Sequence, residues 1–355
     1  MTAEPPASVD ELLARSGHVA LELSGAGQSA WNGEVIKTDG SILGLAHWDG
    51  TLYLDRECIL DPLQRMYEHA GEKQPVQTLV SYRESLATLL HEQAHFLGPA
   101  GSSQEAAQEA FTQPGARQLE EGVAEAWAQD HLDEYLTRLG IDKVAPGIKD
   151  VQAGGYYAAF VPAVRRLTTD LEDRNDLDPG QVLNALNRET AAGQFPLLVS
   201  VVYNSTRLPD LEPSGADTRH RLEAILRSGL AHLDSFDLHP PGYAAAKSHS
   251  TAGQVLDHLH HEVHSAESSY HSHASACALP PRSPDQTTAQ AATHLSPRDP
   301  ANAEARLAPH PLQTALAGVS PPGQKPIGTP ATAAPRRSGR LSINSRDWCS
   351  SASSW

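Results

Sequence analysis

Apolar residues recur every three or four positions in two long segments of this chain. In residues 76–97 they are Leu79, Tyr82, Leu86, Leu89, Leu90, Ala94 and Leu97, and in residues 117–139 they are Leu119, Val123, Trp127, Leu132, Leu136 and Leu139. This spacing predicts two amphipathic helices, and the Gly98-Pro99 pair and Gly140 predict where they end. The polar segment 100–115 between them predicts a connection.

The residues before the first long helix combine a helix start with alternating patterns. Ser8 and Glu11 match a capping box, so we expect a short helix that Gly17 ends. Apolar and polar positions then alternate in residues 18–23, 33–37 and 51–55, which predicts strands, and Asp49-Gly50 predicts a hairpin turn. These strands would form a small antiparallel or mixed sheet.

The second half of the chain has helical patterns and then loses all pattern. Helices are predicted over residues 155–173, 179–190, 196–203 and 219–233, with a short one over 252–264. From residue 276 onward, twelve prolines and few aromatic residues predict a disordered, low-complexity tail. The expected fold class is therefore α+β. We expect the chain to comprise one domain over residues 1–238, a histidine-rich extension over 239–275 and the tail over 276–355. Within the domain, the sheet and the first long helix would extend to about residue 98, and a helical lobe would cover 117–238.

The formal net charge of −16 is distributed unevenly. The tail contains eight Lys or Arg against four Asp or Glu, so the residues before it carry a net charge of −20. An acidic surface repels the phosphate backbone of nucleic acids. We therefore expect no nucleic-acid partner.

The cysteines and the first residues bear on the cell compartment. Cys58, Cys277 and Cys349 lie far apart and form no CxxC pair, so the sequence predicts neither a disulfide framework nor a cysteine metal site. The first residues lack the regions of a signal peptide, and no segment approaches eighteen consecutive apolar residues. We expect a cytoplasmic protein without a membrane partner.

The first long helix carries the string His91-Glu92-Gln93-Ala94-His95. Residues four apart lie on one face of a helix, so both imidazoles can bind one metal ion while Glu92 faces its open coordination position. A zinc ion held in this way lowers the pKa of a bound water, and the adjacent carboxylate takes its proton as the water attacks a carbonyl. The pattern predicts Zn²⁺ as cofactor and Glu92 as general base. The alternative is a pair of surface histidines on an amphipathic helix.

The second long helix offers the third protein ligand. Glu120, Glu121 and Glu125 lie there among small residues that permit close helix packing. We predict that Glu121 binds the metal and that Glu125, one turn further on the same side, accepts the free N–H of a ligating histidine. Glu120 points about a hundred degrees away, and we expect it to be solvated. An ordinary charged helix face is the alternative for the whole group.

These residues resemble those of the gluzincin branch of the zincin metallopeptidases. His91, Glu92 and His95 match the zinc-and-base motif, and residues 121–125 are similar to the family's glutamate-glycine-x-alanine segment. The resemblance covers roughly residues 40–140. It implies a zincin-like fold in which residues 51–55 form the edge strand that lines the substrate cleft.

Two subgroups of that branch compete. Large aminopeptidases share the glutamate-glycine run, and compact intracellular bacterial peptidases that cleave repressors have an ExxA(N/D)xFA pattern similar to residues 121–128. The gap of twenty-five residues between His95 and Glu121 exceeds the aminopeptidase spacing, and no GxMEN-type motif is present. These departures put amino-terminal specificity in doubt and favour the compact type.

The resemblance also implies a side chain that stabilises the oxyanion formed during attack. Tyr156 and Tyr157, at the start of a predicted helix, and His220 are the candidates, and each also suits a packing or surface role. A separate group of histidines crowds into sixteen residues: His258, His260, His261, His264, His271 and His273. Imidazoles at this density bind Zn, Ni or Cu, so the segment is either a metal-gathering arm or a low-complexity extension with incidental affinity.

Together these features predict zinc-dependent hydrolysis of a peptide bond. The peptide or protein substrate would lie between the two lobes and add to the edge strand near Tyr53 through main-chain hydrogen bonds. The alternative is a non-catalytic metal-binding or metal-sensing protein on a zincin scaffold with a histidine-rich arm. A protein-interaction adaptor, which needs no bound metal, is a third possibility.

Overall fold

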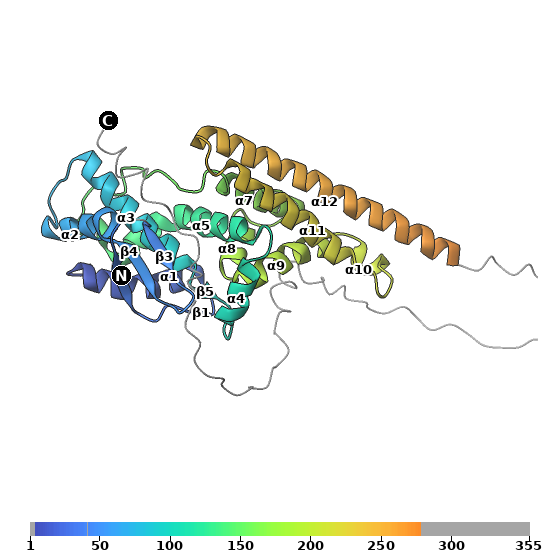
Figure 1. The fold of residues 1–355 in the computed structure, drawn as a ribbon, viewed down its shortest axis with the longest axis horizontal. Coiled ribbons are helices and arrows are strands. Elements are labelled where there is room, and N and C mark those ends of the chain that lie inside the picture. The colour runs from blue at the N-terminus through green and yellow to red at the C-terminus, as the bar shows by residue number, and fades with distance from the viewer. Residues whose placement is uncertain (1–3, 41, 278–355) are drawn as a thin grey trace, which may run out of the picture.

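The structure, a computed structural model, describes residues 4–40 and 42–277. It has the expected α+β class and is mostly helical, with two small sheets. Figure 1 shows the strands with the first helices at one end of the molecule and the later helices at the other. Nearly all of the predicted tail, residues 278–355, lies outside the described residues.

The first helix, α1 (Val9–Ser24), begins as predicted and ends later. The Ser8 hydroxyl accepts the N–H of Glu11 at 3.2 Å, and the Glu11 carboxylate accepts the N–H of Ala7 at 2.9 Å. Gly17 does not end the helix. A Cβ there would lie 2.4 Å from the Trp31 ring, so this glycine permits close packing instead. The predicted strand over residues 18–23 is therefore wrong, and Gly25, with a φ of 67°, caps the helix.

The larger sheet has three strands in the order β2-β4-β3. Strand β2 (Val35–Thr38) runs parallel to β4 (Leu52–Asp55), and β3 (Gly44–Ala46) runs antiparallel to it. The two predicted strands and the turn at Asp49-Gly50 are thus confirmed within a few residues. The expectation that residues 51–55 form the edge is wrong, because β4 is paired on both sides and β3 forms one edge.

The first long helix ends earlier than expected, and the residues that follow it belong to a second, two-stranded sheet. Helix α3 (Val76–Ala94) stops before Leu97, which lies in β5 (Leu97–Gly98) and pairs with β1 (Gln28–Ser29). Between β4 and α3 the chain forms a π-helical turn over Arg56–Leu60 and α2 (Asp61–Glu68). The predicted connection over 100–115 contains α4 (Gln104–Phe111), which Ser103 caps.

Helix α5 (Ala116–Leu139) is the centre of the molecule. It contacts α1, α3, α8 (Gln181–Asn187) and α9 (Ala191–Asn204), as well as α7 (Val161–Arg174) and α11 (Thr218–Ala231), and every residue from 118 to 128 is buried. Gly122 allows this packing, since a Cβ there would lie 2.6 Å from Val164 of α7. The second long helix is confirmed, and Gly140, with a φ of 71°, caps it as predicted.

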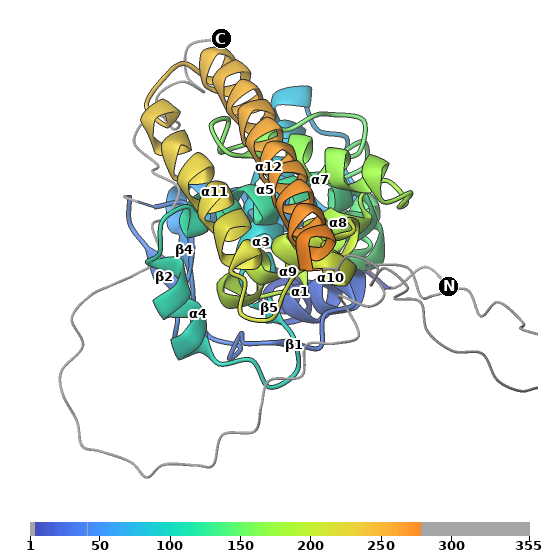
Figure 2. The ribbon, with the colours of Figure 1, turned by 90° about the vertical axis from the view of Figure 1, so that its right-hand side faces the viewer.

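The five helices predicted for the second half of the chain are present with shifted ends, as α7, α8, α9, α11 and α12 (Pro241–Cys277). Two short helices, α6 (Ile141–Val144) and α10 (Leu208–Leu211), and a 3₁₀ turn over His232–Phe236 were not predicted. Helix α12 is much longer than the short helix expected over 252–264. It lies along α7 and α11, as Figure 2 shows. No helix in the described part of the chain is long and apolar enough to cross a membrane.

One cysteine departs from the expectation. Cys58 is disulfide-bonded, whereas the sequence predicted no disulfide framework.

Candidate metal centre

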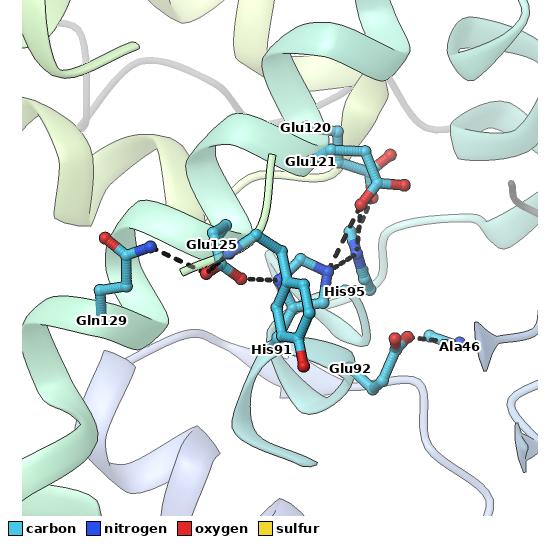
Figure 3. A network of polar contacts seen from close by, with 9 residues as sticks. Ala46, His91, Glu92, His95, Glu120, Glu121, Glu125 and Gln129 are labelled. Atoms are coloured by element: carbon cyan, nitrogen blue, oxygen red, sulfur yellow. Dashed lines mark hydrogen bonds and ion pairs between the residues drawn. The ribbon is translucent and has the colours of Figure 1, made fainter. Parts of the chain in front are cut away.

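Helices α3 and α5 bring three ligand-type side chains together. His91 lies in the last turn of α3, His95 is the residue that caps the end of this helix, and Glu121 faces them from α5; all three are buried. The Nε2 atoms of the two histidines are 3.1 Å apart, and Oε2 of Glu121 lies 3.4 Å from that of His91 and 3.3 Å from that of His95. Figure 3 shows the three groups pointing at one another. This cluster could hold a metal ion.

The size of this triangle fits an ion. Atoms bound at about 2.0–2.1 Å to one tetrahedral centre lie roughly 3.3–3.4 Å apart, close to the three separations observed. Oε2 of Glu121 is buried and receives no hydrogen bond of normal geometry from the described residues. Three lone-pair donors that converge in a buried space are stabilised by a cation between them.

Two further carboxylates set which ring nitrogens face the centre. Oε2 of Glu125 lies 3.0 Å from Nδ1 of His91, and Oε1 of Glu120 lies 3.1 Å from Nδ1 of His95. A carboxylate at Nδ1 favours the tautomer that carries its proton there, which leaves the Nε2 lone pair for a ligand. Glu125 thus lies beside the ring nitrogen of His91 that faces away from Glu121.

Glu120 corrects the expectation that it is solvated. It is 5% exposed and contacts His95, because α5 is enclosed on all sides at this turn and has no solvated face. The hundred-degree rotation between successive residues directs Glu120 to the second histidine instead of to water. The sequence indicates that Glu120 contacts a histidine only once α5 is known to be surrounded by other helices.

We expect that replacing Glu120 by Gln weakens metal binding about 10–100-fold, because such outer partners orient a ligand and raise its basicity. Competition with a chromophoric chelator measures the affinity. The matched control is Glu134→Gln on the same helix, where the side chain is 54% exposed and pairs with Arg138. Equal affinities of Glu120→Gln and the parent would contradict the assigned role.

The imidazoles and carboxylates of this buried cluster compensate one another's charge. Burial alone would lower the pKa of His91, yet Glu121 and Glu125 hold it well above its usual value. Burial would raise the pKa of Glu121, yet His95 and His91 lower it. A cation at the centre therefore competes with protons, and its binding weakens as the pH falls.

Glu92 lies beside the triangle, against strand β3. Its Oε2 accepts the N–H of Ala46 at 2.8 Å, and a Cβ on Gly44 would lie 2.5 Å from its Oε1. Burial raises the pKa of Glu92. In an antiparallel ladder the backbone N–H groups of successive residues point alternately toward and away from the partner strand, and the N–H of Ala46 points away from β4, toward Glu92. The contact between Glu92 and β3 was not expected, because the residues around Glu92 in the sequence do not indicate which strand packs against them.

The loop before α7 brings one tyrosine to the cluster. The Tyr157 ring stacks on His91 with centroids 5.5 Å apart and on Phe160 at the same separation. Its φ of 53° is unusual for a residue with a side chain and marks a site of strain. Burial, with Glu121 and Glu92, raises the pKa of Tyr157 well above its usual value, so the hydroxyl keeps its proton.

The other two oxyanion candidates are placed differently. Tyr156 reaches the cluster through its backbone, whose N–H donates to Oε1 of Glu125 at 2.9 Å. His220 is exposed on α11, and none of the contacts described around the triangle involves it. Of the three candidates, only Tyr157 has its ring against the imidazole of His91.

The same loop rests on a buried acid. Glu84 of α3 is 7% exposed and accepts a backbone hydrogen bond from Gly154, and burial raises its pKa to about 7. The folded protein therefore binds this proton more tightly than the unfolded chain does. The stability from the protonated form is fully present below the unfolded pKa near 4.5 and is lost as the pH rises to about 7.

We therefore expect Glu84→Gln to be more stable than the parent at pH 8, by about 1–3 kcal/mol, and to match it near pH 4.5. Thermal unfolding of both proteins from pH 4.5 to 8 measures the difference. Glu109→Gln, at an exposed position of α4, serves as control and should follow the parent. Parallel curves for Glu84→Gln and the parent would show that the acid is not perturbed.

No protein-family model, curated protein or solved structure matches this chain. Its function is therefore inferred from the cluster itself.

Proposed function

We propose that this protein is a zinc-dependent peptidase of the zincin type that hydrolyses a peptide bond with Glu92 as general base. The observation that carries the proposal is the convergence of His91, His95 and Glu121 at separations of 3.1–3.4 Å, with the carboxylate of Glu92 beside them. Two histidines and a carboxylate with an open fourth position are the ligand set of catalytic zinc sites.

Each side chain of the site has a separate role in the proposed reaction. His91, His95 and Glu121 would hold the zinc, which supplies an activated water and polarises the scissile carbonyl. Glu92 takes the proton of the attacking water and passes it to the leaving amine. Because the Ala46 N–H occupies Oε2, the proton goes to Oε1. The protonated hydroxyl of Tyr157 donates to the developing oxyanion.

Strand β3 replaces residues 51–55 as the proposed docking edge for the substrate. Its partner β4 covers one side, and on the other side the Ala46 N–H donates to Glu92 beside the cluster. An extended peptide that pairs with β3 would lie across the cluster, with its main chain held by hydrogen bonds. The substrate class is therefore an extended segment of a peptide or protein.

The test joins metal analysis to an activity assay. The purified chain should contain one equivalent of zinc and cleave members of a mixed peptide library, and a chelator should stop cleavage that added zinc restores. A chain that holds one tight zinc and cleaves nothing would favour the non-catalytic metal-binding alternative. A chain without stoichiometric metal would favour the adaptor.

A further inference from the structure

The outer face of α12 carries a row of ligand-type side chains. The row contains the exposed residues Asp257, His261, His264, Ser268 and His271, which follow one another in steps of four and three residues along the helix. Such steps keep to one stripe of a helix surface. The six histidines of the sequence cluster are thus not equivalent, and the packing of α12 decides which of them face solvent.

The opposite face fixes the helix against the body. Val255, Leu256 and Leu259 are buried where α12 lies on α7 and α11. The contact is close, since a Cβ on Gly229 of α11 would lie 2.1 Å from Val255. Helix α12 therefore cannot rotate about its axis, and the stripe stays exposed.

His260 lies at the border between these faces and is already engaged. Its Nδ1 is 3.2 Å from the guanidinium of Arg174, and its Nε2 is 3.4 Å from Asp170. No described contact of this kind holds His261 or His264. These two side chains can reorient toward a ligand.

We propose that Asp257, His261 and His264 form a second site for a divalent transition-metal ion such as Ni²⁺ or Zn²⁺. The residues stand at positions i, i+4 and i+7, so each neighbours the next on the helix surface. Neutral imidazoles with a carboxylate suit these ions. The site lies outside the proposed peptidase centre and does not depend on its activity.

Binding here is weaker than at the buried centre. Among the described residues only His91, His95 and Glu121 have ligand atoms already gathered, so the side chains of the stripe must rotate into place. Rotation of exposed side chains costs conformational entropy. The helix supplies the spacing in advance, which favours attachment at two or three points over a single imidazole.

The experiment uses the full chain loaded with one equivalent of zinc and follows the heat of binding on titration with Ni²⁺. The His261→Asn/His264→Asn variant should bind the next Ni²⁺ at least about tenfold more weakly than the parent, because attachment at several points is lost. Asp257→Asn should show a smaller loss. The matched control is His249→Asn, an exposed histidine of α12 whose neighbours three and four residues away are Ala245, Ala246, Ala252 and Gly253.

Two results would overturn the site. Equal Ni²⁺ affinities of the double variant and the parent would show that the stripe does not bind, and an equal loss in His249→Asn would show that any exposed histidine suffices. Circular dichroism of the variants checks that α12 stays helical. Peptide cleavage by the zinc-loaded variant should equal that of the parent, which separates this proposal from the peptidase proposal.

Discussion

Replacing Glu92 by Gln is expected to leave zinc bound and to lower kcat for peptide cleavage by about 10²–10⁴-fold. The amide has nearly the same shape and can still accept the Ala46 N–H, so the packing against β3 persists. It cannot take a proton from the attacking water. Metal content by atomic absorption and turnover of a cleaved library peptide measure the two effects separately.

Glu172→Gln is the matched control for this variant. Glu172 is also buried, at 5% exposed, and its Oε1 accepts the N–H of Val182 at 2.9 Å, so the same substitution tests burial and hydrogen bonding away from the metal centre. It should cleave like the parent. Full activity of Glu92→Gln would exclude Glu92 as the base, whereas loss of its zinc would show that Glu92 supports the metal.

Replacing Glu121 by Ala or Gln is expected to weaken zinc binding by more than about a hundredfold, since loss of an outer partner alone costs 10–100-fold. The substitution removes the only carboxylate in the triangle and leaves two imidazoles. Cleavage should fall with the metal content and return in part at high zinc concentration. Affinity by chelator competition and activity over a zinc series measure both.

The Gln variant keeps the volume of the side chain and guards against collapse of the buried space. Glu134→Ala, at an exposed position of α5, controls for loss of a carboxylate on the same helix. If Glu121→Gln retained one tightly bound zinc, the third ligand would have to be another residue. Glu120 and Glu125 would then be the first to replace.

The two long helices and the grouping of their side chains were accessible from the sequence because both signals are local. The apolar spacing of residues 76–97 and 117–139 located the helices, and the four-residue step from His91 to His95 placed both rings on one face. Glu121 and Glu125 followed from the same helical geometry. The structure brings all four of these side chains together.

The features that escaped prediction depend on contacts between distant segments. Apolar and polar residues alternate over 18–23 as they do in a strand, yet these residues are helical because they pack as part of α1. Glu120 is buried because α5 is surrounded, and β3 is too short to leave a pattern in the sequence. Each outcome follows from tertiary packing, which local spacing does not encode.

The hydrogen bond between Ala46 and Glu92 makes the length of a distant turn matter for the proposed chemistry. The turn at Asp49-Gly50 sets the register of β3 against β4. A slip of one residue would reverse the direction of every backbone group in β3 and turn the Ala46 N–H away from Glu92. An insertion of one residue in this turn would then leave all three metal ligands untouched and still displace the base, so the turn's length is constrained as tightly as the motif itself.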